Sequence, residues 1–334
     1  MSERPLGLST SPPTRQPAGT DTAAPGWLAA TRTVRYQNGM SFSAHTTAAD
    51  VVAGLDLSGR NYLVTGATSG IGLETARVLA SRGAHIVGTG RTLDGTRAAL
   101  ADVAGAGGVT AIACELSEPS SVRAAVAAVA ATGRRLDAII ANAGIMALPT
   151  LTTKYGLELQ FLTNHVGHFL LVTGLLDQLA SDGRVVMVSS MAHHNAPPGG
   201  IDFENLDGAK GYAPWRAYGQ SKVANILFAS SLARRLSSTG KVATSLHPGV
   251  IKTNLTRHLP DRGEGIFARL GAAAMKSIPQ GAATQTLLAA HPSTATVSGQ
   301  YWSDCQPAET TAAARDVELG ERLWRETEAI VGRL

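Results

Sequence analysis

The hydrophobic positions of this chain follow two alternating periods from Tyr62 onward. Short apolar runs, typical of buried strands, are separated by longer stretches whose apolar residues recur every three or four positions, as on one face of a helix. Ile71, Thr75 and Val78 are one such set. The predicted strands are 62–65, 85–89, 109–113, 138–141, 184–189, 242–246 and 300–302. The pattern predicts a single α/β domain, a doubly wound parallel sheet of about seven strands, with its ligand crevice beyond the carboxyl ends of the strands.

The amino-terminal part has a different composition. Residues 1–26 hold five of the fifteen prolines among Ser, Thr and Gly, which cannot bury enough apolar surface to become ordered. Residues 27–48 are richer in aromatic side chains and predict a packed lead-in, and 46–55 predicts a short helix. We therefore expect a tail and lead-in over 1–48, largely disordered to about residue 26, and one domain over 49–334.

Charge and composition narrow the function classes. The formal charge of +4 comes from 29 basic and 25 acidic residues that are scattered along the 334-residue chain, so no nucleic-acid partner is expected. The chain shows neither a signal-peptide pattern nor an apolar stretch long enough to predict a membrane span. Cys114 and Cys305 are the two cysteines, which fits a reducing compartment. We expect a cytoplasmic protein.

A glycine-rich turn follows the first predicted strand and precedes a predicted helix. Gly66 permits a tight turn, Gly70 lets the backbone approach a pyrophosphate, and Gly72 lets the helix pack close to the strand. The helix amino terminus, with its free N–H groups, would face the pyrophosphate. The predicted dinucleotide-binding residues of this turn are Gly66, Thr68, Ser69, Gly70, Ile71 and Gly72.

The end of the second predicted strand bears on which dinucleotide binds. The sequence there is Gly88-Thr89-Gly90-Arg91-Thr92, without the carboxylate that would accept hydrogen bonds from the ribose 2′-hydroxyl of NAD. A guanidinium at Arg91 would instead pair with a 2′-phosphate. The sequence therefore predicts NADP(H) in preference to NAD(H).

Tyr218 and Lys222 are the candidate reacting groups. They lie four residues apart in a predicted helix, so the phenol and the ammonium share one face. A nearby cation lowers the pKa of a phenol, and a shift of about three units would require about 4 kcal/mol from the lysine and a nicotinamide cation together. Tyr218 would then pass a proton to a carbonyl oxygen while hydride reaches the carbon.

Other polar groups collect at the same predicted sheet edge. Ser189-Ser190 ends the fifth predicted strand, where a hydroxyl can hold a substrate oxygen against the tyrosine. The predicted cofactor residues Asn142, Ala143 and Gly144 close the fourth strand beside the expected nicotinamide pocket. The amide of Asn164, in a predicted helix, would anchor a water that leads to Lys222.

These motifs, in this order and spacing, resemble the short-chain dehydrogenase/reductase family from about residue 56 to at least 302. The resemblance implies a Rossmann-type fold, with Asn164, Ser190, Tyr218 and Lys222 as the catalytic tetrad. It implies cofactor contacts at Pro248 and Gly249, and places Thr253 near the nicotinamide carboxamide. The third strand departs from the family pattern, because Glu115 precedes Leu116 where an Asp is usual, so adenine contact by that side chain is open.

Closer likeness is to the retinol-dehydrogenase-like branch, on the segments 164–169, 189–193, 221–227 and 231–249. That branch implies NADP(H) and lipophilic aldehydes, ketones or alcohols. The Ala-, Gly- and Arg-rich composition suggests a bacterial ketoreductase acting on a secondary metabolite such as an aromatic polyketide. Segments 193–215 and 251–281 would select the substrate, the second as an apolar lid.

Several alternatives remain open. The same fold could serve a non-catalytic protein that senses NADP(H), although such proteins usually lose the tyrosine or the lysine. His165 and His168 lie three residues apart but lack a third ligand, so no metal site is expected. His193 and His194 are interpreted as loop residues. The helices around Asn164 and Tyr218 could pair between subunits as a homodimer, and the direction of the reaction is not encoded in the residues.

Overall fold

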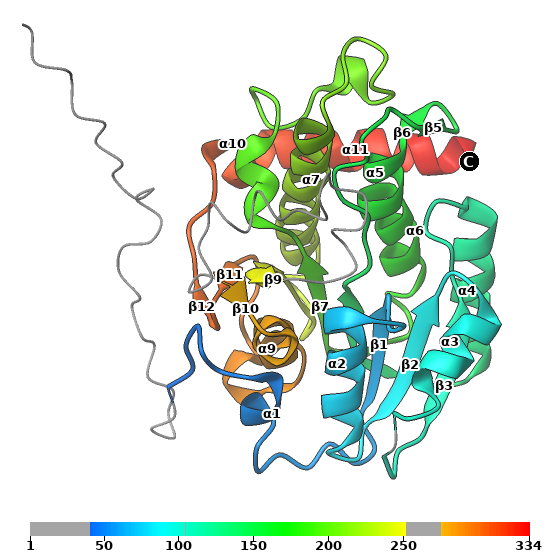
Figure 1. Ribbon diagram of the computed structural model, residues 1–334, viewed down its shortest axis with the longest axis vertical. Coiled ribbons are helices and arrows are strands. Elements are labelled where there is room, and N and C mark those ends of the chain that lie inside the picture. The colour runs from blue at the N-terminus through cyan, green and yellow to red at the C-terminus, as the bar shows by residue number, and fades with distance from the viewer. Residues whose placement is uncertain (1–40, 104, 252–274) are drawn as a thin grey trace, which may run out of the picture. The chain divides into compact units, whose positions relative to one another are not determined.

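The computed structural model describes residues 41–103, 105–251 and 275–334 (Figure 1). The expected tail, most of the lead-in, nearly all of the expected apolar lid, and Thr253 lie outside the described residues. Among the described residues, no helix is both long enough and apolar enough to cross a membrane.

An eight-stranded sheet runs through the described part of the chain in the order β12-β11-β8-β7-β4-β1-β2-β3. All its neighbouring strands are parallel except β11 and β12. The strands are β1 (Asn61–Thr65), β2 (His85–Gly90), β3 (Val109–Ala113), β4 (Leu136–Ala141), β7 (Leu179–Val188), β8 (Val242–His247), β11 (Tyr301–Ser303) and β12 (Gln306–Pro307). From β1 the chain adds β2 and β3 on one side, and then places β4 and the later strands on the other side of β1. The ligand crevice of such a sheet lies at this switch point, beyond the carboxyl ends of β1 and β4.

The predicted α/β fold is confirmed, with differences at its edges. Each predicted strand is present, and β7 begins at Leu179 rather than at 184. An eighth strand, β12, pairs antiparallel with β11. It has two residues, too few to show a hydrophobic period in the sequence. The expected helix over 46–55 is shorter, α1 (Ala48–Val51), and Thr47 and Asp50 form a capping box at its start.

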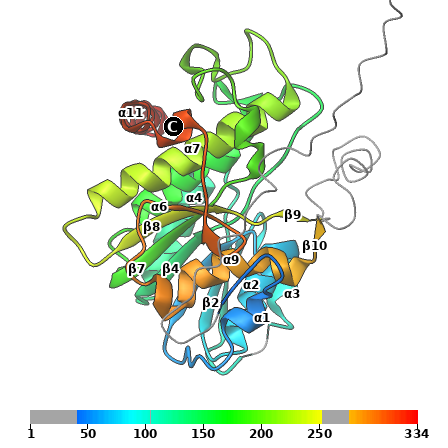
Figure 2. The same cartoon turned by 90° about the vertical axis from the view of Figure 1, so that its left-hand side faces the viewer.

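Helices cover both faces of the sheet (Figure 2). Alternate strand residues face opposite layers. Val64 packs with α1, α2 (Gly70–Ala80) and α9 (Ile278–Ala290), while its neighbour Leu63 packs with α4 (Pro119–Ala131), α6 (Gly167–Gly174) and α7 (Pro214–Arg235). Further helices are α3 (Leu93–Leu100), α5 (Leu159–Phe161), α10 (Ala312–Arg315) and α11 (Val317–Arg333). Burial on both faces explains why the strands read as continuous apolar runs.

Smaller elements connect these layers. The π-helix η2 (Leu162–Val166) lies between α5 and α6, and the 3-10 helix η3 (Met191–Asn195) follows β7. Two further 3-10 helices are η4 (Phe203–Asn205) and η8 (Pro292–Thr294). Two-residue strands form the pairs β5 (Thr153–Lys154) with β6 (Leu157–Glu158) and β9 (Val250–Ile251) with β10 (Met275–Lys276).

Candidate active site

The glycine turn between β1 and α2 is tightly closed. Gly66 and Gly70 adopt positive φ angles of 67° and 58°, which favour glycine. A Cβ on Gly72 would lie 2.4 Å from the carbonyl oxygen of Gly66 and 2.5 Å from Nδ2 of Asn142. The first turn of α2 therefore packs directly against the turn and against the loop that follows β4.

The amino terminus of α2 is suited to an anion. Ser69 occupies the N-cap position but makes no capping hydrogen bond through its side chain. The first N–H groups of the helix thus face the turn without a side-chain acceptor, together with the positive end of the helix dipole. These groups fit a dinucleotide pyrophosphate, and the half-buried Thr68 and Ile71 border the same turn.

Thr65, the last residue of β1, ties this turn to the loop after β4. Its hydroxyl oxygen accepts hydrogen bonds from the backbone amides of Asn142 and Ala143, both at 2.9 Å. Its carbonyl oxygen accepts from Nδ2 of Asn142 at 2.8 Å. The ends of β1 and β4 are therefore joined at the switch point by three hydrogen bonds.

Two predicted cofactor residues end β2 and β3. Arg91 is exposed and follows Gly90, where an added Cβ would lie 2.5 Å from Cγ2 of Thr68, so the guanidinium projects from a backbone that contacts the glycine turn. Glu115 turns back on its own loop, because one carboxylate oxygen accepts from the backbone amide and the hydroxyl of Ser117. The neighbouring Leu116 is buried against α6.

Asn164 lies at the centre of the π-helix η2 and is fully buried. Its Oδ1 accepts from the amide of Ile145 at 2.8 Å, and its Nδ2 donates to the carbonyl of Ile145 at 2.9 Å and to Oγ of Ser221 at 3.0 Å. A Cβ on Gly144 would lie 3.0 Å from Oδ1 of Asn164 and 3.5 Å from Nζ of Lys222. Asn164 thus connects the loop after β4 to α7 and lies close to the lysine.

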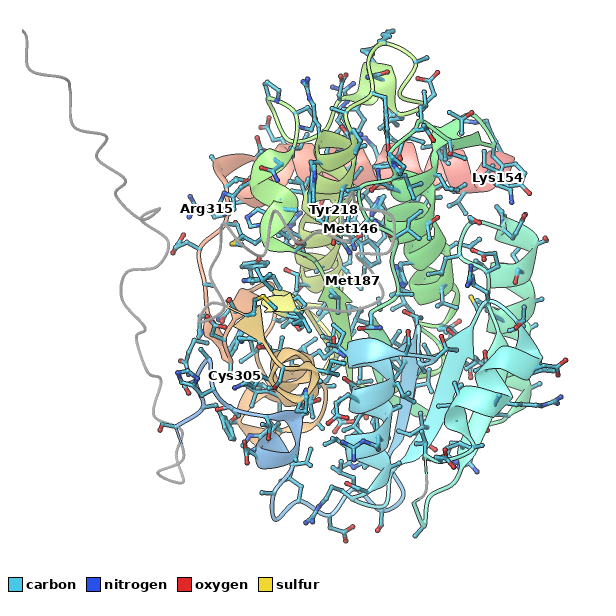
Figure 3. The ribbon with its side chains drawn as sticks, in the orientation of Figure 1. Met146, Lys154, Met187, Tyr218, Cys305 and Arg315 are labelled. Carbon is cyan, nitrogen blue, oxygen red and sulfur yellow. The ribbon has the colours of Figure 1, made fainter. Side chains whose placement is uncertain are left out.

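Tyr218 and Lys222 share one face of α7, as expected from their spacing. The lysine Nζ lies 5.5 Å from the centroid of the tyrosine ring and donates to the carbonyl oxygen of Val188 at 3.1 Å. Both side chains are less than 5% exposed. Figure 3 shows Tyr218 on α7 beyond the end of β7 that carries Met187.

The pKa shifts of this pair go in opposite directions. Burial raises the pKa of Tyr218 to about 12, while a hydrogen bond with Ser190 acts against the rise. Burial lowers the pKa of Lys222 to about 8. The sequence argument expected a lowered tyrosine pKa. In the chain alone, without the nicotinamide cation of that argument, the direction is the reverse, because desolvation outweighs the hydrogen bond with Ser190.

The two serines after β7 have different roles. Ser189 is buried, and its hydroxyl donates to the carbonyl of Lys222 at 2.8 Å. Ser190 is half-buried, caps η3 by accepting from the amide of Ala192, and bonds to the Tyr218 hydroxyl. The structure therefore places Ser190, and not Ser189, beside the phenol.

Pro248 and Gly249 follow β8 at the same sheet edge. Gly249 has a positive φ of 98°, and its amide donates to Nδ1 of His247 at 3.0 Å. The Lys276 side chain lies against Gly249 and pairs with Asp304 at 2.5 Å. Both predicted residues are thus at the expected edge, while Thr253 lies outside the described part of the chain.

Sequence reasoning missed the roles of Thr65, Ser221 and His168. Thr65 begins the motif of the glycine turn, but its sequence position alone did not predict that its hydroxyl binds the loop after β4. His168 is fully buried and contacts Asn164 and Thr65, and His165 contacts Thr327 of α11 at 3.0 Å. Each histidine therefore has a hydroxyl partner, and within the described residues no three potential metal ligands come together.

Comparison with known proteins agrees with this geometry. The family model for short chain dehydrogenases matches residues 60–263, so the chain belongs to the short-chain dehydrogenase/reductase family of nicotinamide-dependent oxidoreductases. Its relatives place it in the retinol-dehydrogenase-like branch of that family.

Three similar proteins illustrate the relationship. A probable oxidoreductase of Streptomyces antibioticus is 44% identical over 297 residues, covering 81% of this chain and 97% of the relative. Human retinol dehydrogenase 13 is 37% identical over 286 residues, covering 83% and 86%. The crystal structure of an uncharacterized protein from Mycobacterium paratuberculosis is 34% identical, with a TM-score of 0.68 over 86% of this chain and 97% of that one.

Proposed function

We propose that this protein is an NADP(H)-dependent oxidoreductase that reduces a lipophilic ketone or aldehyde to an alcohol, or catalyses the reverse reaction. The observation that carries the proposal is the buried group formed by Tyr218, Ser190 and Lys222, in which the phenol is bonded to the serine and lies over the ammonium. The catalytic residues proposed are Asn164, Ser190, Tyr218 and Lys222.

A bound nicotinamide cofactor supplies or accepts the hydride. The chain itself handles the proton and the carbonyl. Tyr218 remains protonated up to a pKa of about 12, so its hydroxyl can donate to a carbonyl oxygen that Ser190 holds in place. The phenolate formed in that step is stabilised by the ammonium of Lys222, and Asn164 keeps the loop after β4 in position through Ile145.

The substrate preference rests on the surroundings of Tyr218. The indole of Trp215 meets the phenol edge-on at 6.1 Å between ring centroids, and the half-buried Met146 follows Ile145, to which Asn164 is bonded. Such groups favour an apolar, aromatic substrate. We propose a bacterial secondary metabolite, such as an aromatic polyketide ketone. The cytoplasmic location and a homodimer stay predictions.

The decisive test is Tyr218→Phe, assayed for NADPH oxidation with a panel of aromatic ketones and aldehydes. We expect kcat to fall by at least about 100-fold, since the general acid is lost, with NADPH affinity within about twofold of the original. If the unaltered protein binds NADPH tightly but turns over no carbonyl compound, the NADP(H)-sensing alternative replaces this proposal.

The cofactor preference has its own test in Arg91→Ala. A lost charge-assisted hydrogen bond to the 2′-phosphate should raise the KM for NADPH by about 10- to 100-fold and leave the KM for NADH unchanged. Arg97→Ala is the matched control, since Arg97 is an exposed arginine of the adjoining helix α3. An unchanged ratio of NADPH to NADH efficiency in Arg91→Ala would remove the basis for the NADP(H) preference.

A further inference from the structure

His168 is a buried histidine with a partner at each ring nitrogen. Nδ1 lies 2.9 Å from the carbonyl oxygen of Asn164, and Nε2 lies 2.9 Å from the hydroxyl of Thr65. A carbonyl oxygen only accepts, so Nδ1 carries the proton, and Nε2 of a neutral imidazole must accept from the Thr65 hydroxyl. Burial and the nearby Lys222 ammonium keep the ring neutral by lowering its pKa to about 4.

This assignment fixes the orientation of the Thr65 hydroxyl. Its hydrogen goes to His168, which leaves both lone pairs for the amides of Asn142 and Ala143. The other acceptor within reach, the carbonyl oxygen of Ile140, is 3.5 Å away and too distant for a good O–H···O bond. Without His168 the Thr65 hydroxyl would lose the acceptor that fixes the direction of its hydrogen.

The network reaches the reacting groups from two sides. His168 is bonded to Thr65, which binds the amides of residues 142 and 143. The Asn164 side chain bonds to both the amide and the carbonyl of Ile145, two residues further along the loop. Gly144 lies between these attachments and next to Nζ of Lys222. A displacement of this loop would therefore change the position of Gly144 relative to the Lys222 ammonium.

We propose that His168 is a positioning residue, which holds the loop after β4 and the π-helix that carries Asn164 in the register needed for catalysis. It touches no reacting atom, and acts through Thr65 and Asn164. The inference rests on the proposed function where turnover is concerned, but the effect on the loop is independent of it.

The matched control is His85, the first residue of β2. It lies at the amino-terminal end of the strand, away from the carboxyl ends that form the site. Its Nδ1 lies 2.7 Å from the carbonyl oxygen of Gly107, and its Nε2 lies 2.9 Å from the hydroxyl of Thr110. It is also buried. His85→Leu and His168→Leu therefore each remove one hydrogen bond to a backbone carbonyl and one to a threonine hydroxyl, at opposite ends of the strands.

The first measurement is amide hydrogen exchange of the protein without cofactor, followed at Asn142 and Ala143. We expect exchange there to accelerate about tenfold in His168→Leu and at least as much in Thr65→Val, because both free the loop. The double variant should exchange no faster than Thr65→Val, because His168 acts on the loop through the Thr65 hydroxyl and that hydroxyl is already absent in Thr65→Val. Thr65→Ser, which keeps the hydroxyl, should restore slow exchange, and His85→Leu should leave these two amides unchanged.

The second measurement is turnover. His168→Leu should lower kcat, normalised to the folded fraction, about tenfold with substrate KM within about twofold, whereas the matched control His85→Leu should change neither. If His168→Leu does not fold, Thr65→Val and Thr65→Ser test the same bond. Unchanged exchange at Asn142 and Ala143, or effects of Thr65→Val and His168→Leu that multiply in the double variant, would overturn the inference. A wild-type protein that reduces no carbonyl compound would overturn the proposed function alone.

Discussion

At the scale of single residues, the site depends on two buried groups whose pKa values have been moved apart. Burial raises the pKa of Tyr218 to about 12 and lowers that of Lys222 to about 8. Both pKa shifts disfavour the charged form. The phenol therefore stays protonated and can donate, and the lysine ammonium loses its proton more easily than an exposed one. The lysine is therefore the group that titrates first as pH rises.

A pH dependence of catalysis follows from the lysine. The kcat/KM for carbonyl reduction should be level from about pH 6 to 7, fall to about half near pH 8 and then decline, approaching about tenfold per pH unit, as Lys222 loses its proton. Tyr218 remains protonated throughout this range. Initial rates measured from pH 6 to 10 with saturating NADPH check this. A profile that stays level to pH 10 would contradict the role given to the ammonium.

The same lysine should reduce the stability of the fold. Its pKa of about 8 in the folded chain is below the ordinary 10.5, so between these values the unfolded chain binds more protons and stability rises with pH. Below pH 8 the cost of burying the charge is fully present. Lys222→Met should thus raise the free energy of unfolding at pH 7 by about 2 kcal/mol while abolishing turnover.

Urea unfolding at pH 7 and at pH 10 measures this stabilisation. The carbonyl of Val188 keeps a partner in the variant, because Nδ2 of Asn225 also donates to it at 3.2 Å. The difference between Lys222→Met and the original chain should shrink at pH 10. A variant less stable than the original at pH 7 would show that the ammonium is a net stabilising group.

A sequence pattern encodes the spacing of residues along the chain but not their tertiary contacts, so it predicts some features of these residues and not others. The spacing of Tyr218 and Lys222 requires a shared helix face, and the structure has it. The direction of the tyrosine pKa shift depends on its depth of burial and on its hydrogen bond with Ser190, and residue spacing contains neither. His168 was missed as a link because its partner Thr65 is 103 positions away in the chain.

At the scale of elements, α7 and η3 must approach closely to bring Tyr218 to Ser190. Gly219, next to Tyr218, makes this possible: a Cβ there would lie 2.6 Å from the carbonyl oxygen of Ala192 and 2.7 Å from the amide of Ala196. Both neighbours are backbone atoms and cannot move independently. The contact therefore sets the distance between the helix and the turn that begins at Ser190.

Gly219→Ala should disturb this contact. We expect a loss of about 1 to 3 kcal/mol in the free energy of unfolding and a lower kcat, because η3 and Ser190 are pushed from Tyr218. Gly332→Ala is the control, since a Cβ at that position of α11 meets nothing within 4 Å. Thermal unfolding and turnover of both variants check this, and a Gly219→Ala protein with original kcat would contradict the close-contact argument.

The sequence predicted most elements because each strand is buried on both faces and each helix has one apolar face. It predicted the helix around Asn164 but not its π form, since a single wider turn leaves the apolar period intact over five residues. The edge strand β12 has two residues, one of them Pro307, and offers no period at all. Local backbone detail at the site thus depends on tertiary contacts.

At the scale of the whole molecule, α11 covers the outer surface of α7. Trp324 stacks on Phe228 of α7 at 5.4 Å and meets Phe169 of α6 edge-on at 4.9 Å, and the Arg235 guanidinium lies 3.9 Å from the Trp324 ring centroid. Figure 2 shows α11 lying outside α7. This coverage could not be deduced from periodicity, because an amphipathic helix does not specify which surface it will meet.

The coverage bears on the predicted homodimer, since the helices around Asn164 and Tyr218 have part of their outer surface buried by the same chain. Trp324→Ala should expose this apolar surface, lower the free energy of unfolding by about 3 kcal/mol, and increase self-association over the original chain. Val317→Ala, an exposed position of the same helix, is the control. Urea unfolding and sedimentation velocity measure the two effects. If Trp324→Ala is destabilised but shows the same mass distribution as Val317→Ala, then α11 supports the fold without shielding a subunit contact, and any dimer must use another surface.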